Sequence, residues 1–221
     1  MHKEQFESFI KFHEEIQKNR FKPRIYRGVC NHNYPLKPKI GWLPLLPNKS
    51  REIEEIELFN RFKQAAVLHT YDRPKNDWEW LALSQHHGLP TRLLDWTDNP
   101  LVALFFSVFE ASNEDSVVYV FENPTWINID KYESPFNIDN VGRVDIPHVT
   151  PRISTQSGFF TIHPNPEIEL DNDNIKAIII PNNMRRDIKQ MLHNYGINQM
   201  TIFPGLDGVA NHLKWLRSEL Y

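Results

Sequence analysis

The stretch from Ser84 to Pro100 constrains the fold more than any other part of the chain. It reads SQHHGLPTRLLDWTDNP, so polar and charged side chains surround only two adjacent leucines. Gly88 permits a positive φ angle, and Pro90 disfavours the α-helical region at the residue before it. The chain must turn sharply here. A segment built only for packing would not carry so many polar groups, and we interpret it as a rigid corner that presents them at a pocket.

Regular elements are expected on both sides of this corner. The segment from Asp77 to His87 is typical of a helix, with Asp77 as its predicted N-cap and Gly88 just past its end. After the corner, Thr91 to Trp96 is typical of a short strand. An apolar helix from Leu101 to Glu110 is expected next.

Asp95 lies on that short strand, and residue alternation predicts that it faces at least partly inward. A buried carboxylate needs a partner, and Arg27 or Arg92 would supply one in a bidentate geometry. The structural alternative for Arg92 and Asp95 is an ion pair that shapes the corner without touching a ligand. Thr97 has a similar alternative as an ordinary hydroxyl beside a helix.

In the rest of the chain, some segments have apolar residues at helical spacing and others resemble strands. Further helices are expected at Glu4–Lys18, Glu52–Thr70, Met184–Tyr195 and Leu206–Leu216, and further strands at Arg24–Cys30, Val117–Glu122, Ile153–Ile162, Lys176–Ile180 and Gln199–Phe203. The strands are grouped centrally and late, so we predict an α+β fold with a central mixed, mostly antiparallel sheet flanked by helices.

Composition limits the classes of function. The 221 residues carry a formal net charge of -3, which argues against a nucleic-acid binder that works by bulk attraction. Cys30 is the only cysteine, so no internal disulfide forms and a reducing, cytoplasmic setting is expected. No apolar run has the length of a signal peptide or a membrane span. We expect one ordered domain over residues 1–221, with an N-terminal helix in residues 1–20.

Several common sites lack sequence support. His86 and His87 are adjacent and point in divergent directions, and no HExxH or CxxC pattern occurs, so no metal is predicted. The phosphate-binding and nucleophile motifs GxxxxGK[ST], GxGxxG and GxSxG are absent. Without a local signature around it, Cys30 is better interpreted as a small buried thiol.

Two segments late in the chain offer polar groups for a site. Glu167 and Glu169 would share one face of a strand, although the neighbouring Pro, Asn and Asp residues favour a solvated acidic loop. Gln156 is a polar amide on a strand that otherwise resembles core, where it would contact a ligand or satisfy backbone groups.

The polar segments together resemble the FRG domain family, named after a Phe-Arg-Gly motif. Here Tyr26 replaces the Phe, and Arg27 and Gly28 follow it. The resemblance spans about Tyr26 to Leu213. It is carried by Tyr26-Arg27-Gly28, Tyr34-Pro35-Leu36-Lys37-Pro38, Gln85 to Thr97 with Pro100, Ala103 and Phe106, Arg152-Ile153 with Gln156, Gly158, Phe159 and Thr161, and Phe203 to Gly208.

The order of motifs is also similar, more distantly, to ADP-ribosyltransferases, in which an early arginine holds the NAD phosphates and a later strand carries a Glu or Gln. That similarity implies an ADP-ribosyltransferase-like fold with NAD as cofactor. Its implied catalytic residues are Arg27, Thr97, and Gln156 or Glu169, with Glu167 as another alternative. Residues implied to bind the nucleotide are Tyr26, Arg27, Gly28, His86, His87, Thr91, Arg92, Asp95 and Trp96.

Three hypotheses about function stay open. The first is an NAD-dependent transferase or glycohydrolase. It would be a toxin or phage-defence effector that acts on a protein or nucleic acid and that an inhibitory partner would restrain. The second is a non-catalytic module that binds a nucleotide or another phosphate ligand. The third is phosphodiester cleavage by His86 or His87 with Arg27, for which no spacing is distinctive.

Overall fold

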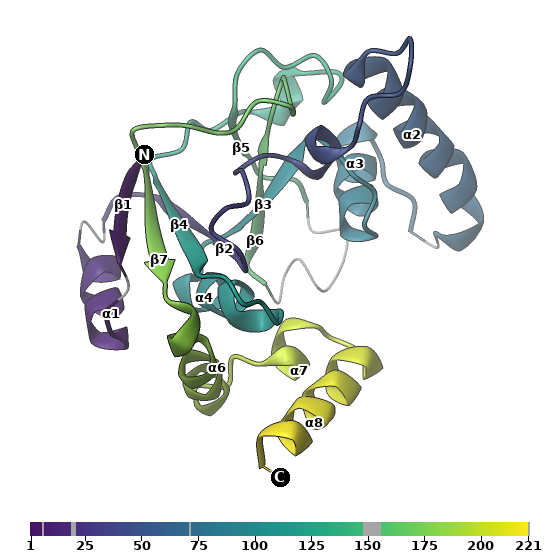
Figure 1. Ribbon diagram of the computed structural model, residues 1–221. Helices are drawn as coiled ribbons and strands as arrows, with labels where there is room; N and C mark the ends of the chain where they lie inside the picture. The colour runs from purple at the N-terminus through teal and green to yellow at the C-terminus, as the bar shows by residue number, and fades with distance from the viewer. Residues whose placement is uncertain (6, 19–20, 71, 148–155, 221) are drawn as a thin grey trace.

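A single mixed sheet organises the computed structural model, which describes residues 1–5, 7–18, 21–70, 72–147 and 156–220. Over these residues seven strands pair in the order β1-β7-β4-β2-β3-β6-β5 (Figure 1). Only β1 and β7 are parallel, and every other neighbouring pair is antiparallel. The strands are β1 His2–Gln5, β2 Arg24–Val29, β3 Leu93–Thr97, β4 Ser116–Glu122, β5 Gly142–Val144, β6 Gly158–Ile162 and β7 Ile175–Ile180. The predicted α+β class is confirmed.

Helices cover one face of this sheet in two groups. Apolar side chains of α1, α4, α6 and α7 pack with β2, β4 and β7, and those of α2 and α3 pack with β3, β5 and β6. Irregular segments that contain Leu36 and Leu170 cover the other face. The helices are α1 Phe9–Gln17, α2 Arg51–Ala66, α3 Asp77–His86, α4 Pro100–Phe109, α6 Arg185–Asn194, α7 Gln199–Ile202 and α8 Leu206–Leu220.

The sheet opens between its two halves. β2 and β4 pair along six residues, whereas β2 and β3 pair only at Tyr26 and Thr97. Arg27, the next residue on β2, therefore has no partner residue on β3. Because α4 packs on β2 while α3 belongs to the group over β3, the opening lies between the two groups of helices.

The start of one predicted helix and the type of one predicted strand are wrong. Residues 2–5 form a strand beside β7, and α1 begins only at Phe9, where the Ser8 hydroxyl caps it. The segment predicted as a last strand, 199–203, is the short helix α7. The Asn198 side chain accepts bonds from the first amides of α7, and the Thr201 hydroxyl accepts one from the Asn198 amide. This reciprocal capping favours a helix over the β-branched pattern.

Smaller details of the sequence prediction also change or stay untested. Asn76, not Asp77, is the N-cap of α3. Gly88 and Gly196 have the positive φ angles expected after helices, 90° and 78°. The predicted strand residues 153–155 lie outside the described residues. No helix in the described ranges is long and apolar enough to cross a membrane.

Candidate functional site

A cleft of about 690 Å³ lies over the opening in the sheet. Most of its lining comes from four elements: Tyr26–Gly28 of β2, Asp95–Thr97 of β3, the end of α3 at Gln85–Gly88, and Ala103 and Phe106 of α4. This places residues from the Tyr26-Arg27-Gly28 and Gln85–Thr97 motifs in one concave site. Concave sites with a few convergent polar groups are where small ligands usually bind.

Arg27 fills the gap between β2 and β3. Its Nη1 donates to the backbone oxygen of Asp95 at 2.7 Å and lies 3.8 Å from Asp95 Oδ2. The side chain is 25% exposed, and its Nε has no hydrogen-bond partner among the described residues. Burial lowers the pKa of Arg27, with Asp95 opposing that shift. A partly buried guanidinium with donors to spare suits an anionic ligand.

Asp95 faces the cleft instead of the core, so the expectation of an inward carboxylate is wrong. Its side chain is 59% exposed and lines the cleft over the opening in the sheet. Of the two arginines proposed as partners, Arg27 is the one that contacts it, and through a single nitrogen, not as a bidentate pair.

A relay of hydrogen bonds orients the Asp95 carboxylate. The Thr91 hydroxyl donates to Gln85 Oε1 at 2.8 Å, and Gln85 Nε2 donates to Asp95 Oδ2 at 2.9 Å. The Thr91 oxygen also accepts the Leu93 amide, which fixes it to the corner. Thr91 is 1% exposed and does not line the cleft, so it acts on the site through Gln85.

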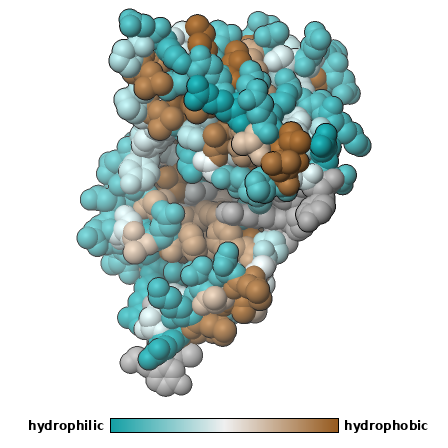
Figure 2. All heavy atoms as spheres, turned by 90° about the vertical axis from the view of Figure 1, so that its right-hand side faces the viewer, coloured by the Kyte–Doolittle hydropathy of each residue, from teal (hydrophilic) through white to brown (hydrophobic). Residues whose placement is uncertain are grey.

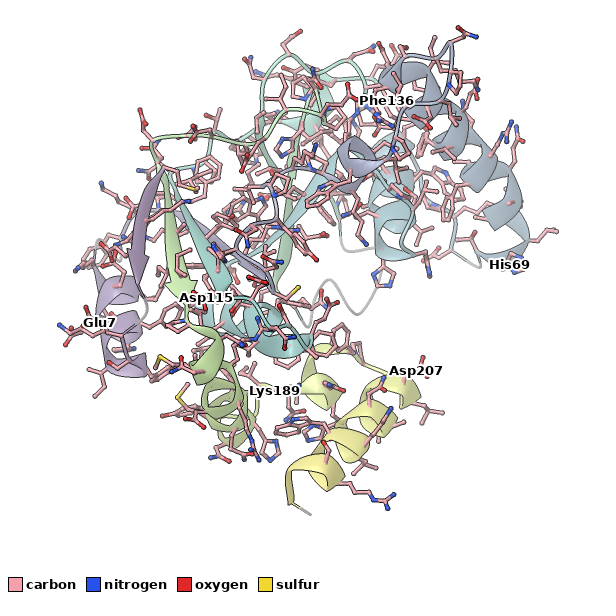
Figure 3. The ribbon with its side chains drawn as sticks, in the orientation of Figure 1. Glu7, His69, Asp115, Phe136, Lys189 and Asp207 are labelled. Carbon is pink, nitrogen blue, oxygen red and sulfur yellow. The ribbon has the colours of Figure 1, made fainter. Side chains whose placement is uncertain are left out.

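Arg92 is held away from the cleft by Glu55 of α2. Its Nε and Nη2 donate to Glu55 Oε2 at 3.0 and 2.9 Å, and its backbone amide donates to Glu55 Oε1 at 2.8 Å. Its guanidinium lies 4.7 Å from the centre of the Phe136 ring, which Figure 3 labels beside the top of α2. Burial raises the pKa of Glu55, and Arg92 opposes that shift. This ion pair anchors the corner to α2.

Thr97 and Gln156 meet at the far end of the cleft. The Thr97 hydroxyl donates to the backbone oxygen of Gln156 at 2.7 Å and accepts the Asn99 amide at 3.1 Å. Gln156 Nε2 donates to the backbone oxygen of Ile202 at 3.3 Å. Both residues line the cleft, although each side chain already has a protein partner.

The aromatic rings predicted to contact a ligand are mostly buried. Tyr26 is 5% exposed within the core beside α4, and Trp96 is 3% exposed and donates to the Thr161 hydroxyl at 2.9 Å. Both residues border the cleft. Their position suits shaping the floor, whereas stacking on a ligand requires an exposed ring.

His86 and His87 both line the cleft at the end of α3. Their ring centres lie 5.0 Å apart and the rings are nearly perpendicular, at 86°. Within the described ranges, no group of three or more His, Cys, Asp or Glu side chains is placed to hold a metal ion.

Glu167 and Glu169 lie elsewhere, in an irregular segment after β6. Glu169 Oε1 accepts the Leu36 amide at 3.2 Å, and Glu167 Oε1 accepts from Arg51 at 3.3 Å. Neither residue lines the cleft. Of the alternatives for the third site residue, only Gln156 is there.

Sequence reasoning missed Glu110 and Lys39, which both line the cleft. Glu110 follows the last residue of α4 and accepts a hydrogen bond from Cys30 at 3.5 Å. A carboxylate at the carboxyl end of a helix is unfavourable, because the helix dipole is negative there. This unfavourable position of Glu110, at the end of the predicted helix, is a signal visible in the sequence. Lys39 lies in a short 3₁₀ helix, Lys39–Trp42, whose position no local pattern indicated.

Two further cavities adjoin the cleft, and all three share Phe106 and Glu110. One, of about 600 Å³, is bounded by Phe203 and by α8 at Asp207, which Figure 3 labels. Figure 2 shows the molecule hollowed above its lower part, which α7 and α8 form. The other, of about 480 Å³, is the groove beside Tyr34 and Trp42.

A buried polar chain lies behind the cleft floor. The Trp96 indole donates to the Thr161 hydroxyl, which lies 3.0 Å from His163 Nε2. Burial, with the charge of Arg27 as a second cause, lowers the pKa of His163 to about 3. His163 is therefore uncharged at neutral pH. It adds no positive charge that would compete with Arg27 for an anion.

Fold and cleft together define an α+β protein with a polar, cation-bearing site over the opening in its sheet. Residues 22–116 match the sequence model of the FRG domain, so this chain carries an FRG domain. The matched residues contain Arg27, Lys39, the Gln85–Asp95 relay and Glu110. The later motifs around Gln156 and Phe203 lie beyond the match, and Arg152 and Ile153 lie outside the described residues. No curated protein and no solved structure matches the chain.

Proposed function

We propose that the cleft binds a dinucleotide of the NAD type and cleaves the bond between its ribose and nicotinamide. The observation that carries this proposal is the position of Arg27. Its partly exposed guanidinium lies at the opening of the sheet, in a cleft that Lys39, Glu110 and Gln156 also line. Two cations and a separate carboxylate in one cavity match a ligand with phosphates at one place and a cationic ring at another.

Arg27 and Lys39 would hold the phosphates. A guanidinium offers several donors in a planar fork, and an ammonium adds a mobile positive charge. Asp95 and the backbone oxygen it carries fix Arg27 in place, and Gln85 fixes Asp95. The site is thereby oriented before the ligand arrives, which reduces the entropy lost on binding.

Glu110 is the carboxylate we assign to the chemical step. The bond between ribose C1′ and the nicotinamide nitrogen breaks, and its electron pair neutralises the positive charge of that nitrogen. The ribose then carries oxocarbenium character, which a nearby carboxylate stabilises. Water or a nucleophile of an acceptor adds its oxygen or nitrogen to C1′ and releases a proton. Gln156 lacks the charge to replace Glu110 in this role.

The acceptor decides the biological outcome. Transfer to water would deplete NAD, and transfer to a protein or nucleic acid would modify that macromolecule. Either activity would suit a toxin or phage-defence effector, which an inhibitory partner would restrain. A second candidate is a module that binds a nucleotide without turnover. The contact between the Arg27 guanidinium and Asp95 supports it, because Asp95 already accepts a hydrogen bond from Arg27 and partly neutralises its charge.

The test is nicotinamide release from NAD by the purified protein, with and without cell lysate. We expect Arg27→Ala to abolish release and Glu110→Gln to reduce it by about 100-fold or more. Arg61→Ala and Glu133→Gln are matched controls, because both residues are exposed and neither lines the cleft. Melting curves of all four variants separate a loss of chemistry from a loss of folding.

Each result decides between the candidates. Release that persists in Arg27→Ala would contradict the proposal. A melting temperature that collapses with the activity would instead point to a structural role for Arg27. If no nicotinamide is released under any condition, calorimetry with NAD distinguishes the binding module from a cleft that takes no nucleotide.

A further inference from the structure

The groove beside the cleft has a different character from the cleft itself. Apolar and aromatic side chains form most of its wall, at Val29, Tyr34, Leu36, Trp42, Pro90 and Phe106. Tyr34 is 45% exposed and Trp42 is 44% exposed, and their ring centres lie 5.5 Å apart in an edge-to-face arrangement. Exposed rings of this kind can stack on the flat face of a ligand.

The segment that carries these rings is fixed to the body of the protein. The Leu36 amide donates to the Glu169 carboxylate at 3.2 Å, and the Leu36 carbonyl oxygen accepts the Leu170 amide at 2.8 Å. Gly41 packs so closely on the backbone of Pro166 that a Cβ there would lie 1.9 Å from the Pro166 oxygen. Trp42 donates its indole N–H to the Lys37 oxygen at 3.1 Å. The aromatic surface is thus formed before any ligand binds.

The groove and the cleft meet at the two cations of the proposed phosphate site. Arg27 and Lys39 line both cavities, together with Gln85 and Asp95. Lys37 adds a third positive charge to the groove, 5.9 Å from the centre of the Trp42 ring. Asp95 and Glu110 are the carboxylates in the lining, and Asp95 already faces Arg27.

We propose that this groove holds the adenine base of the nucleotide, stacked on Trp42 or Tyr34, with the phosphates at Arg27 and Lys39 and the remainder of the ligand in the cleft. This inference rests on the proposed function. The charges decide which ring enters the groove. The nicotinamide ring of NAD is cationic and would be repelled by Lys37 and Lys39, whereas adenine is neutral.

The test is calorimetric titration with AMP, NAD and nicotinamide mononucleotide. We expect Trp42→Ala to weaken AMP and NAD binding roughly ten-fold, the usual cost of removing a ring that stacks on a base. Trp42→Phe keeps a ring and should recover most of the affinity. Nicotinamide mononucleotide should bind Trp42→Ala as it binds the wild type. Trp126→Ala is the matched control, because Trp126 is 59% exposed and lines neither cavity.

The same titrations separate this inference from the proposed function. Equal NAD affinity in the wild type, Trp42→Ala and Tyr34→Ala would overturn the base site and leave NAD binding intact. Trp42-dependent AMP binding without any NAD binding or cleavage would overturn the proposed function and support the base site. Weakened nicotinamide mononucleotide binding in Trp42→Ala would overturn the assignment of adenine. If an acidic peptide bound the groove and no nucleotide did, both proposals would be wrong.

Discussion

Gly28 lies under α4 with no room for a side chain. A Cβ at this position would lie 1.8 Å from the Ala103 carbonyl oxygen and 2.6 Å from the Ser107 amide nitrogen. Both are backbone atoms of a buried helix, so neither can move independently. We expect Gly28→Ala to lower the free energy of unfolding by about 3 kcal/mol, at the upper end of overpacking costs.

Gly88→Ala provides a comparison within the same site. Gly88 has open space around its Cα and a φ of 90°, so only the backbone conformation resists a side chain there. We expect that variant to lose about 1–2 kcal/mol. Urea unfolding of both variants measures the difference, and a Gly28→Ala loss no larger than that of Gly88→Ala would show that α4 can shift away from β2.

Glu55 anchors the corner to α2 through its contacts with Arg92. With its side chain 2% exposed, it is the carboxylate that neutralises the buried Arg92. Glu55→Gln would leave that guanidinium buried without its counter-charge, and we expect a loss of about 3–5 kcal/mol. Glu57→Gln, on the exposed side of the same helix, should leave the unfolding midpoint almost unchanged. Similar midpoints for the two variants would contradict a structural role for the ion pair.

At the same scale, local motifs predicted part of the site and not the rest. The corner and the Tyr26-Arg27-Gly28 motif of β2 predicted that Arg27, Asp95 and both histidines belong to one pocket. All four residues line the cleft. The partner of Arg92 could not be predicted, because Glu55 is 37 residues away on a helix whose orientation depends on tertiary packing. Lys39 was unpredictable for a similar reason, since its 3₁₀ helix is positioned by the contact between Gly41 and Pro166.

At the scale of elements, α7 depends on its cap. Its four residues are too few to form a stable helix alone, and Asn198 supplies acceptors for two of its amides. We expect Asn198→Ala to lower the free energy of unfolding by about 1 kcal/mol and to disturb the cavity wall at Gln199 and Phe203. Thermal melting and the affinity for NAD measure the two effects. Unchanged values for both would mean that packing alone holds α7.

The strength of the local signal explains which elements were predicted from sequence. The apolar helix α4 and the strands β4 and β7 carry long, clear patterns, and the structure confirms them. β1 was missed because its pairing with β7 joins residues 174 positions apart, at His2 and Lys176. The pattern of Met200, Thr201 and Ile202 favours a strand, but the cap at Asn198, just before α7, makes this segment a helix.

At the scale of the whole molecule, His163 makes stability depend on pH. Its pKa is lowered from the ordinary 6.5 to about 3 by burial and, second, by Arg27. Between these values the unfolded chain binds a proton that the folded protein does not. The contribution of His163 to the free energy of unfolding is therefore fully present above about pH 6.5. As the pH falls towards about 3, this contribution is lost by up to about 1.4 kcal/mol per pH unit.

The prediction is tested by urea unfolding of wild type and His163→Gln at intervals from pH 7 to pH 4. The variant should be less stable at pH 7, because Thr161 loses its imidazole partner, but its stability should fall less steeply on acidification. His69→Gln is the control: His69 is exposed at the far end of α2 (Figure 3), so this change should preserve the wild-type slope. Equal slopes in wild type and His163→Gln would mean that the buried imidazole accepts a proton in the fold, and the charge behind Arg27 would then rise as the pH falls.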